Sequence, residues 1–160
     1  MSSGDHDTEH LIHDKHGAEY RIVESPRETY IRFKVLNQRV MVAYVNCGMR
    51  GEVLRIIDLF VASSAVHKPW FHWDLFFFAL SFPPVKRRTV NYQDRGIGTA
   101  MIRFLVDYAR SNSAKRIEGD VKHHDYKNNQ DLPAWYRRRG FTVVMNDGTG
   151  VGIAKISMEV

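Results

Sequence analysis

One stretch of the chain decides the fold prediction: Val90-Asn91-Tyr92-Gln93-Asp94-Arg95-Gly96-Ile97-Gly98-Thr99. Gly96 and Gly98 flank a single residue, and glycine lets the backbone approach a ligand closely or take a positive φ. An amphipathic helix pattern follows at once. Its apolar face consists of Ala100, Met101, Phe104, Leu105 and Tyr108. Because a glycine-rich turn at a helix N-terminus offers free backbone N–H groups and the positive end of the helix dipole, the stretch predicts a phosphate-binding loop.

The composition of the whole chain agrees with an anionic ligand. The 160 residues suit one domain, and 44% hydrophobic with 26% charged residues is ordinary for a soluble globular protein. The net charge of +5 favours a polyanionic partner, either a nucleotide-like cofactor or nucleic acid. A single cysteine, Cys47, excludes an internal disulfide framework and is typical of a reducing compartment. With neither a signal peptide nor an apolar run of bilayer length, we expect a cytoplasmic protein without a membrane partner.

The N-terminal residues 1–17 are polar and predict a flexible tail. Four histidines recur in it and would share one face of a helix. They are His6, His10, His13 and His16. Since neither a cysteine nor an apolar anchor supports them, we predict no metal site.

Residues 18–61 predict an antiparallel meander. Short strands are expected at 20–23, 30–35 and 40–45, with a tight turn at Asn37-Gln38 between the last two. Residues 53–61 form a longer apolar run, which suits a strand in the centre of the sheet.

An insert at about residues 62–90 separates this central strand from the loop. It predicts either a helix or an extra strand pair, and it is rich in aromatic residues. These are Trp70, Phe71, Trp73, Phe76, Phe77, Phe78 and Phe82. Two roles stay open for them: cover for a sheet face or a homodimer contact, and the wall of a substrate pocket. The first is favoured, because large aromatics mostly supply burial.

Beyond the loop, the predicted helix ends near residues 111–113 and a strand follows at 116–121. The order of helix and strand makes that strand parallel to the central one. Residues 123–129 predict a polar loop, and Asp131 is placed to cap a short helix that Gly140 ends. Strands at 141–145 and 151–158 complete the chain.

Two motifs in this order resemble the GNAT (GCN5-related) family of N-acetyltransferases. Gln93-x-x-Gly96-x-Gly98 matches its acetyl-CoA-binding signature, and residues 132–141 resemble its second motif, an aromatic-Tyr pair followed by Gly-Phe. The resemblance covers about residues 90–145. It departs from the family in the insert and in lacking room for two helices between the first strands.

The resemblance implies an α/β (α+β) fold: a single GNAT-like domain over residues 18–160, with a mixed central sheet, two parallel central strands that splay apart, and flanking helices. Acetyl-CoA would be the co-substrate, with its pantetheine arm in the splay and its pyrophosphate on backbone amides of the loop. The residues expected to bind it are Val61, Gln93, Asp94, Arg95, Gly96, Ile97, Gly98, Thr99 and Asn129.

Acetyl transfer to an amine requires removal of a proton from an ammonium with a pKa of about 10, and protonation of the leaving thiolate. Members of the family often use a tyrosine at this position of the second motif as the acid, which implies that role for Tyr136. Alternatively, Tyr136 only packs in the core with its hydroxyl hydrogen-bonded. Members of the family often carry a carboxylate on the central strand, and the resemblance therefore implies that Asp58 is the base. The other candidates are Glu118, His123 and His124. The amine acceptor, of a small molecule or a protein, stays open.

Two other functions remain as alternatives. One is a non-catalytic acyl-CoA-binding module, because a fold does not guarantee chemistry. The less favoured one is a basic nucleic-acid-binding domain that uses residues 86–88 and 137–139. This alternative lacks a recognisable nucleic-acid-binding motif.

Overall fold

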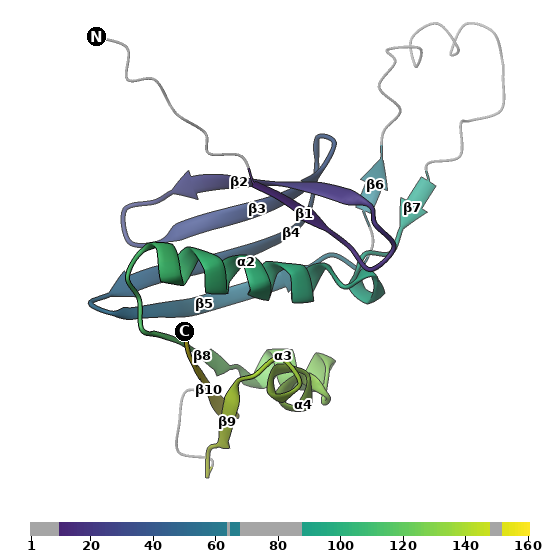
Figure 1. Ribbon diagram of the computed structural model, residues 1–160. Helices are drawn as coiled ribbons and strands as arrows, with labels where there is room; N and C mark the ends of the chain where they lie inside the picture. Colours follow the sequence, from purple (N-terminus) through teal and green to yellow (C-terminus); the bar gives the residue numbers. More distant parts are fainter. Residues whose placement is uncertain (1–9, 64, 68–87, 148–151) are drawn as a thin grey trace, which may run out of the picture.

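The computed structural model describes residues 10–63, 65–67, 88–147 and 152–160. Within them, eight strands form one sheet in the order β1-β2-β3-β4-β5-β8-β10-β9, and β6 pairs with β7 separately (Figure 1). The strands are β1 (His10–His13), β2 (Glu19–Pro26), β3 (Ile31–Asn37), β4 (Val40–Arg50), β5 (Val53–Val61), β6 (Ala65–His67), β7 (Arg88–Val90), β8 (Arg116–Val121), β9 (Thr142–Met145) and β10 (Ala154–Glu159). The helices are the 3-10 helix η1 (Gln93–Arg95), α2 (Ile97–Ser111), α3 (His123–Asn128) and α4 (Leu132–Arg137).

The first half of the sheet is the predicted meander, because β2 to β5 each pair antiparallel with the next. The tight turn between β3 and β4 is shifted by one residue from its predicted place. Asn37 still pairs with Val40, so the turn consists of Gln38 and Arg39, and Gln38 takes a positive φ of 56°. A non-glycine residue in this region gives no clear sequence signal.

The prediction of a tail over residues 1–17 is wrong for its second part. His10–His13 forms β1, which pairs with β2, and Ile12 is buried in the core. Two apolar residues inside a polar segment gave no alternation from which a strand could be predicted. His10 and His13 lie on this strand, not on a helix, and the described part of the chain holds no cluster of metal-ligating residues.

The insert is described only at its two ends, where β6 and β7 pair antiparallel. An extra strand pair is one of the two structures predicted for this region. The aromatic residues between positions 70 and 82 lie outside the described residues, so both predicted roles stay predictions. No helix within the described ranges is long and apolar enough to cross a membrane.

Helix α2 lies across one face of the meander (Figure 1). It buries Ile97, Met101, Leu105 and Ala109, which are spaced four residues apart and so share one side of the helix. At its edge, Phe104 and Tyr108 pack edge-on against Phe33 of β3, with ring centroids 5.0 and 4.8 Å apart. This packing confirms the amphipathic helix predicted after the loop.

The two central strands separate where the sequence analysis predicted a splay. β5 and β8 pair in parallel from Val53 opposite Arg116 to Ile56 opposite Gly119, and no further. A Cβ on Gly119 would lie 3.2 Å from the carbonyl oxygen of Ile56, so this close approach requires glycine. Directly beyond, β5 has a β-bulge at Ile57, where the register with β4 shifts. The bulge re-aims the side chains that follow it.

The second motif has a structural explanation at the end of α4. Gly140 takes φ 89°, its N–H donates to the Arg137 carbonyl at 3.0 Å, and the Phe141 N–H donates to the Tyr136 carbonyl at 3.2 Å. This pattern is a Schellman turn. The Phe141 ring folds back against Tyr136, with centroids 5.3 Å apart. The Gly-Phe pair therefore ends the helix, as predicted, and fixes the tyrosine ring.

Two local predictions around α4 are wrong. Residues 123–129 are not all loop, since α3 (His123–Asn128) is a short helix; six residues without apolar periodicity give no helical pattern. Asp131 does occupy the N-cap position of α4, but its side chain makes no capping hydrogen bond and pairs with Arg138 instead.

Candidate active site

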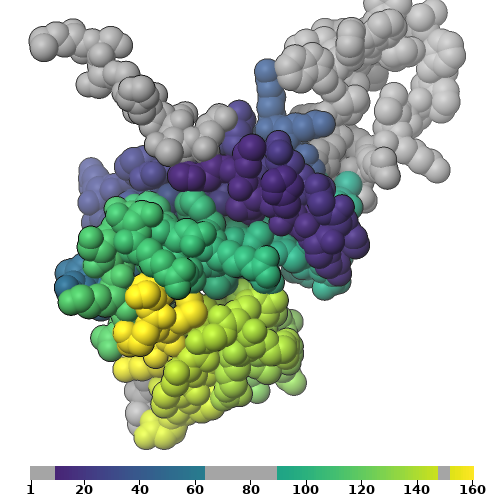
Figure 2. Space-filling model, in the orientation of Figure 1, coloured from purple at the N-terminus to yellow at the C-terminus, as the bar shows by residue number. Residues whose placement is uncertain are grey.

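A cavity of about 1010 Å³ occupies the splay between β5 and β8. We call it the splay cavity. Most of the residues predicted to form the site line it. These are Asp58, Val61, Gln93, Asp94, Gly96, Gly98, Thr99, Asn129 and Tyr136. Residues of the N-terminal strands, of α2 and of the C-terminal elements together line the cavity. Figure 2 shows the surface of α2 in contact with that of the C-terminal elements.

Two predicted cofactor residues, Arg95 and Ile97, do not line the cavity. The Ile97 side chain is fully buried in the core, and the Arg95 side chain turns toward Asp14. Only their backbone groups could reach a ligand. Because the expected contact of the loop with the pyrophosphate is through backbone amides, Arg95 and Ile97 stay predicted cofactor residues through their backbone.

The loop itself has the geometry of an anion cradle. Gly96 takes φ 84° and is the residue before α2, and the first N–H groups of a helix have no acceptor within it. A Cβ on Gly98 would lie 3.2 Å from the Trp135 ring of α4, so a larger residue would push against that ring. The residues here therefore fit a phosphate group at the N-terminus of α2.

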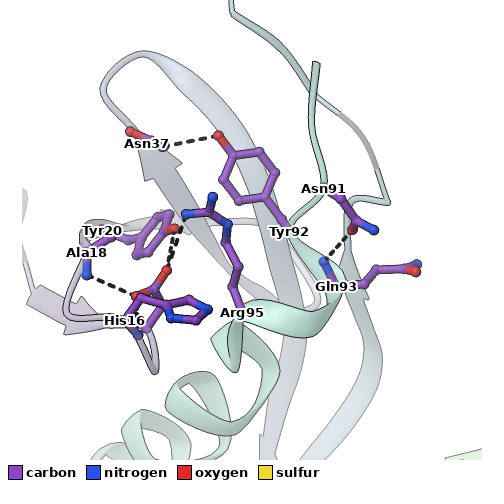
Figure 3. A network of polar contacts seen from close by, with 9 residues as sticks. His16, Ala18, Tyr20, Asn37, Asn91, Tyr92, Gln93 and Arg95 are labelled. Carbon is purple, nitrogen blue, oxygen red and sulfur yellow. Dashed lines mark hydrogen bonds and ion pairs between the residues drawn. The ribbon is translucent and has the colours of Figure 1, made fainter. Parts of the chain in front are cut away.

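A buried carboxylate fastens the loop to the turn between β1 and β2 (Figure 3). Asp14 accepts hydrogen bonds at 2.9 Å from the N–H groups of His16 and Ala18 and from the hydroxyl of Tyr20, and it lies 3.6 Å from an Arg95 nitrogen. Burial acts to raise the pKa of Asp14, but these hydrogen bonds and the Arg95 charge lower it overall. The turn and the loop thus share one charged network.

The same turn contacts the loop through its backbone. The Lys15 N–H donates to the Arg95 carbonyl at 2.9 Å, and the ring of Tyr20 packs edge-on against that of Tyr92, whose hydroxyl accepts from Asn37 at 3.1 Å. Lys15 also lines the splay cavity. The turn gives no clear signal in the sequence, because it lies in a polar segment that has the composition of a tail.

Arg139 is a second residue that the sequence analysis did not single out. Its Nε donates to the Thr99 hydroxyl at 2.9 Å, and its guanidinium stacks on the Trp135 ring at 3.7 Å. Burial, together with the charges of Arg138 and Arg103, lowers its pKa. The run of three arginines before Gly140 was the available signal, but the sequence could not show which of them turns inward.

Asp58 and Tyr136 both line the cavity, at the end that we call the strand end, and the charge of Asp58 acts on the Tyr136 hydroxyl. The hydroxyl of Tyr44 on β4 donates to Asp58 Oδ2 at 2.9 Å. Tyr136 is buried, and burial raises its pKa, with further contributions from the charges of Asp125 and Asp58 against an opposing one from Arg139. The three side chains come from three elements that the fold brings together.

The remaining candidate bases and the cysteine are arranged differently. Among Glu118, His123 and His124, only His124 lines the cavity, where its ring is 3.1 Å from the Asn128 amide. Cys47 is fully buried, and this burial, with the charge of Glu24, raises its pKa to about 12. Such a thiol does not supply a nucleophilic thiolate near neutral pH.

The charged residues along the cavity differ between its two ends. Near the loop, the lining includes the cations Lys15, Arg103 and Arg139 and the carboxylates Asp14 and Asp94. At the strand end, beside Asp58, it includes Asp120 and Asp125. The strand end is thus electrically suited to a cation, and the loop end offers cations of its own to an anion.

Comparison with known proteins agrees with this architecture. Residues 90–141 match the model of the Acetyltransferase (GNAT) family. No curated protein matches the chain significantly. The sequence-based resemblance to this family and the GNAT-like fold class are confirmed.

Three solved structures illustrate the likeness. PaiA N-acetyltransferase from Thermoplasma acidophilum, in complex with coenzyme A, is 11% identical, with 82% of this chain and 62% of that chain covered and a TM-score of 0.54. Tetrahymena GCN5 is 10% identical, with 84% and 70% covered and a TM-score of 0.53. The ribosomal-protein-S18-alanine N-acetyltransferase from Escherichia coli is 16% identical, with 84% and 72% covered and a TM-score of 0.51. At these identities the likeness concerns the fold.

Proposed function

We propose that this chain, which has the GNAT fold and matches the GNAT acetyltransferase family over residues 90–141, is an acetyl-CoA-dependent N-acetyltransferase that works by direct attack of an amine on the thioester. One observation carries the proposal: a single cavity connects the N-terminus of α2 with Asp58 and Tyr136. An anion cradle, a carboxylate and a phenol are the groups that direct transfer requires.

Bound acetyl-CoA would supply the activated acetyl thioester. In the proposal, backbone N–H groups between Gly96 and Thr99 hold its pyrophosphate, and the Arg139 guanidinium adds a positive charge beside them. Val61 and Asn129 line the cavity along the path toward the strand end. The thioester would thereby be directed to the residues that move protons.

Asp58 is proposed to accept the proton of the acceptor ammonium. Tyr44 donates to Asp58 Oδ2 at 2.9 Å, which orients the carboxylate and leaves its other oxygen for the amine. Burial, followed by the hydrogen bond and charge of Asp58, raises the pKa of Tyr44, so this phenol stays a donor. Removal of the ammonium proton frees the lone pair that attacks the carbonyl carbon.

Tyr136 is proposed to donate its hydroxyl proton to the departing sulfur. Because its pKa is raised, the hydroxyl holds its proton until the thiolate forms. A raised pKa also makes it a weaker acid. The same burial and the same carboxylates also raise the proton affinity of a thiolate beside it, which offsets the weaker acidity of the phenol.

The proposal is tested by thermal shift with acetyl-CoA, followed by a free-thiol assay over a panel of amines. Tyr136→Phe should lower kcat by about 10²- to 10³-fold, with the acetyl-CoA dissociation constant changed by no more than about twofold. Tyr108→Phe is the matched control, because Tyr108 also lies partly buried but outside the splay cavity.

Two results would contradict the proposal. Binding of acetyl-CoA without turnover of any amine would indicate a non-catalytic acyl-CoA-binding module. A salt-dependent interaction with DNA or RNA, together with no stabilisation by acetyl-CoA, would indicate a nucleic-acid-binding domain.

A further inference from the structure

The strand end of the splay cavity gathers four titratable side chains from four elements. Tyr44, Asp58, Asp125 and Tyr136 come from β4, β5, α3 and α4, and all line the cavity. The charges of Asp58 and Asp125 both act on Tyr44 and on Tyr136, in addition to the larger effect of burial. The two carboxylates therefore face a common space from opposite sides of the splay.

Neither of these carboxylates forms an ion pair with a residue of the described ranges. The third acid at this end, Asp120, is neutralised by Arg55 at 2.7 Å. Arg32 is the cation nearest to Tyr44, with its guanidinium 4.9 Å from the ring centroid, but its Nε donates to Asn46 and it does not line the cavity. Among the described residues, two carboxylates without an ion-pair partner thus remain at the strand end.

One carboxylate is enough for the proposed proton transfer, so Asp125 has no part in that step. In the first turn of α3, the Asp125 carboxylate interacts favourably with the helix dipole, which would be a purely structural role. Such a role does not explain why a half-buried carboxylate lines a cavity opposite a second one. A ligand with two positive charges would satisfy both.

We propose that the acceptor carries a second cationic group, besides the amine that is acetylated, and that Asp125 binds this group while Asp58 receives the reacting amine. The stacked rings of Tyr44 and Phe60, with centroids 5.4 Å apart, lie beside the site and favour a cation further. The acceptor class is a diamine, or a lysine with a basic neighbour in a peptide. This inference rests on the proposed function.

The test compares three four-carbon amines of matched length: butane-1,4-diamine, butylamine and 4-aminobutanoate. Their binding to the CoA-loaded protein is measured by calorimetry near neutral pH, and their turnover by thiol release. We expect the diamine to bind about tenfold more tightly than butylamine, and 4-aminobutanoate most weakly. A peptide pair, with Arg or Glu next to the acceptor lysine, distinguishes a basic peptide from a small diamine as the source.

Variants assign the effect to one side chain. Asp125→Asn should reduce the preference for the diamine to about twofold or less, and Asp125→Glu, which keeps the charge, should restore most of it. Asp107→Asn is the control, because Asp107 is an exposed acid of α2 outside the splay cavity. It should keep the parental preference.

Equal binding of butylamine and the diamine, or a preference for 4-aminobutanoate, would overturn the inference. A parental preference in Asp125→Asn would also overturn it, and would leave Asp125 with its role in α3 alone. If the diamine binds selectively through Asp125 but no amine is acetylated, the proposed function fails while the inference about the ligand stands.

Discussion

Asp14 offers the sharpest test of how the loop is held. Its Oδ1 accepts two backbone N–H groups, and its Oδ2 accepts the Tyr20 hydroxyl and faces Arg95. Asp14→Asn keeps the first pair but places an amide NH2 against Arg95, which should cost about 2 kcal/mol. Asp14→Ala leaves all three donors without their acceptor, which should cost about 3–5 kcal/mol.

The assay is urea unfolding followed by tryptophan fluorescence. Glu19→Gln is the control on the same hairpin, since Glu19 forms only an exposed pair with His13 and should cost about 0–0.5 kcal/mol. If Asp14→Asn unfolds with the same free energy as this control, the network does not stabilise the fold and the reasoning is refuted.

The pH dependence of the same measurement supplies a second check. The folded-state pKa of Asp14 is lowered from 3.8, so its contribution is fully present above that value and is lost as the pH falls through the lower, folded value. The difference between the parent and Asp14→Asn should therefore be constant near neutral pH and shrink below about pH 4. A difference that persists unchanged in acid would contradict the assignment.

The network should also matter for the ligand, because the loop is joined to the hairpin through Lys15 and Arg95. Loss of about 1 kcal/mol of loop preorganisation would weaken acetyl-CoA binding roughly fivefold in Asp14→Asn. Calorimetry at a temperature where both proteins remain folded measures this effect. Unchanged affinity would mean that the loop holds its shape without Asp14.

Three further predictions follow from single residues. Gly98→Ala places a Cβ 3.2 Å from Trp135 and should weaken acetyl-CoA binding by about tenfold in a titration, whereas unchanged affinity would show that the ring yields easily. The pKa of Tyr136 is raised above its ordinary value of 10.0, so its ionisation should not lower kcat below about pH 10. A decline of kcat that begins below about pH 10 in the parent and is absent in Tyr136→Phe would contradict this assignment. Ser113→Gly relieves a φ of 59° at the end of α2 and should stabilise the fold by about 0.5–1 kcal/mol in urea unfolding; a loss of stability would argue against strain there.

The parts that the sequence could predict depend on neighbouring residues. Gly96 and Gly98 at the start of an amphipathic helix, and Gly140-Phe141 at the end of a short one, are local arrangements whose backbone geometry permits few alternatives. The parallel strand after α2 follows from the order of elements alone. These features predicted the order of the elements, and the family resemblance that the two motifs carry implied the splay and most of the residues that line the cavity.

The parts that escaped prediction depend on contacts between distant residues. Asp14 looks like an ordinary polar residue of a tail until the fold places it against Arg95. Arg139 lies in the turn after α4, where its side chain, unlike those of its two neighbouring arginines, reaches Thr99. Residue type and spacing contain neither fact, because each is determined by how two separate segments pack.

The sequence gives the net charge but not where the charges lie in the fold, and their location bears on the proposed acceptor. The net charge of +5 favours an anionic ligand, and Lys15 and Arg139 at the loop end agree with it. A net charge is a sum over the molecule, however, and it conceals Asp58 and Asp125 at the strand end. The proposed catalyst, which joins an anionic cofactor to a cationic amine, benefits from carboxylates gathered at the strand end, because they attract the amine. The local charge, and not the total, therefore carries the information about the proposed acceptor.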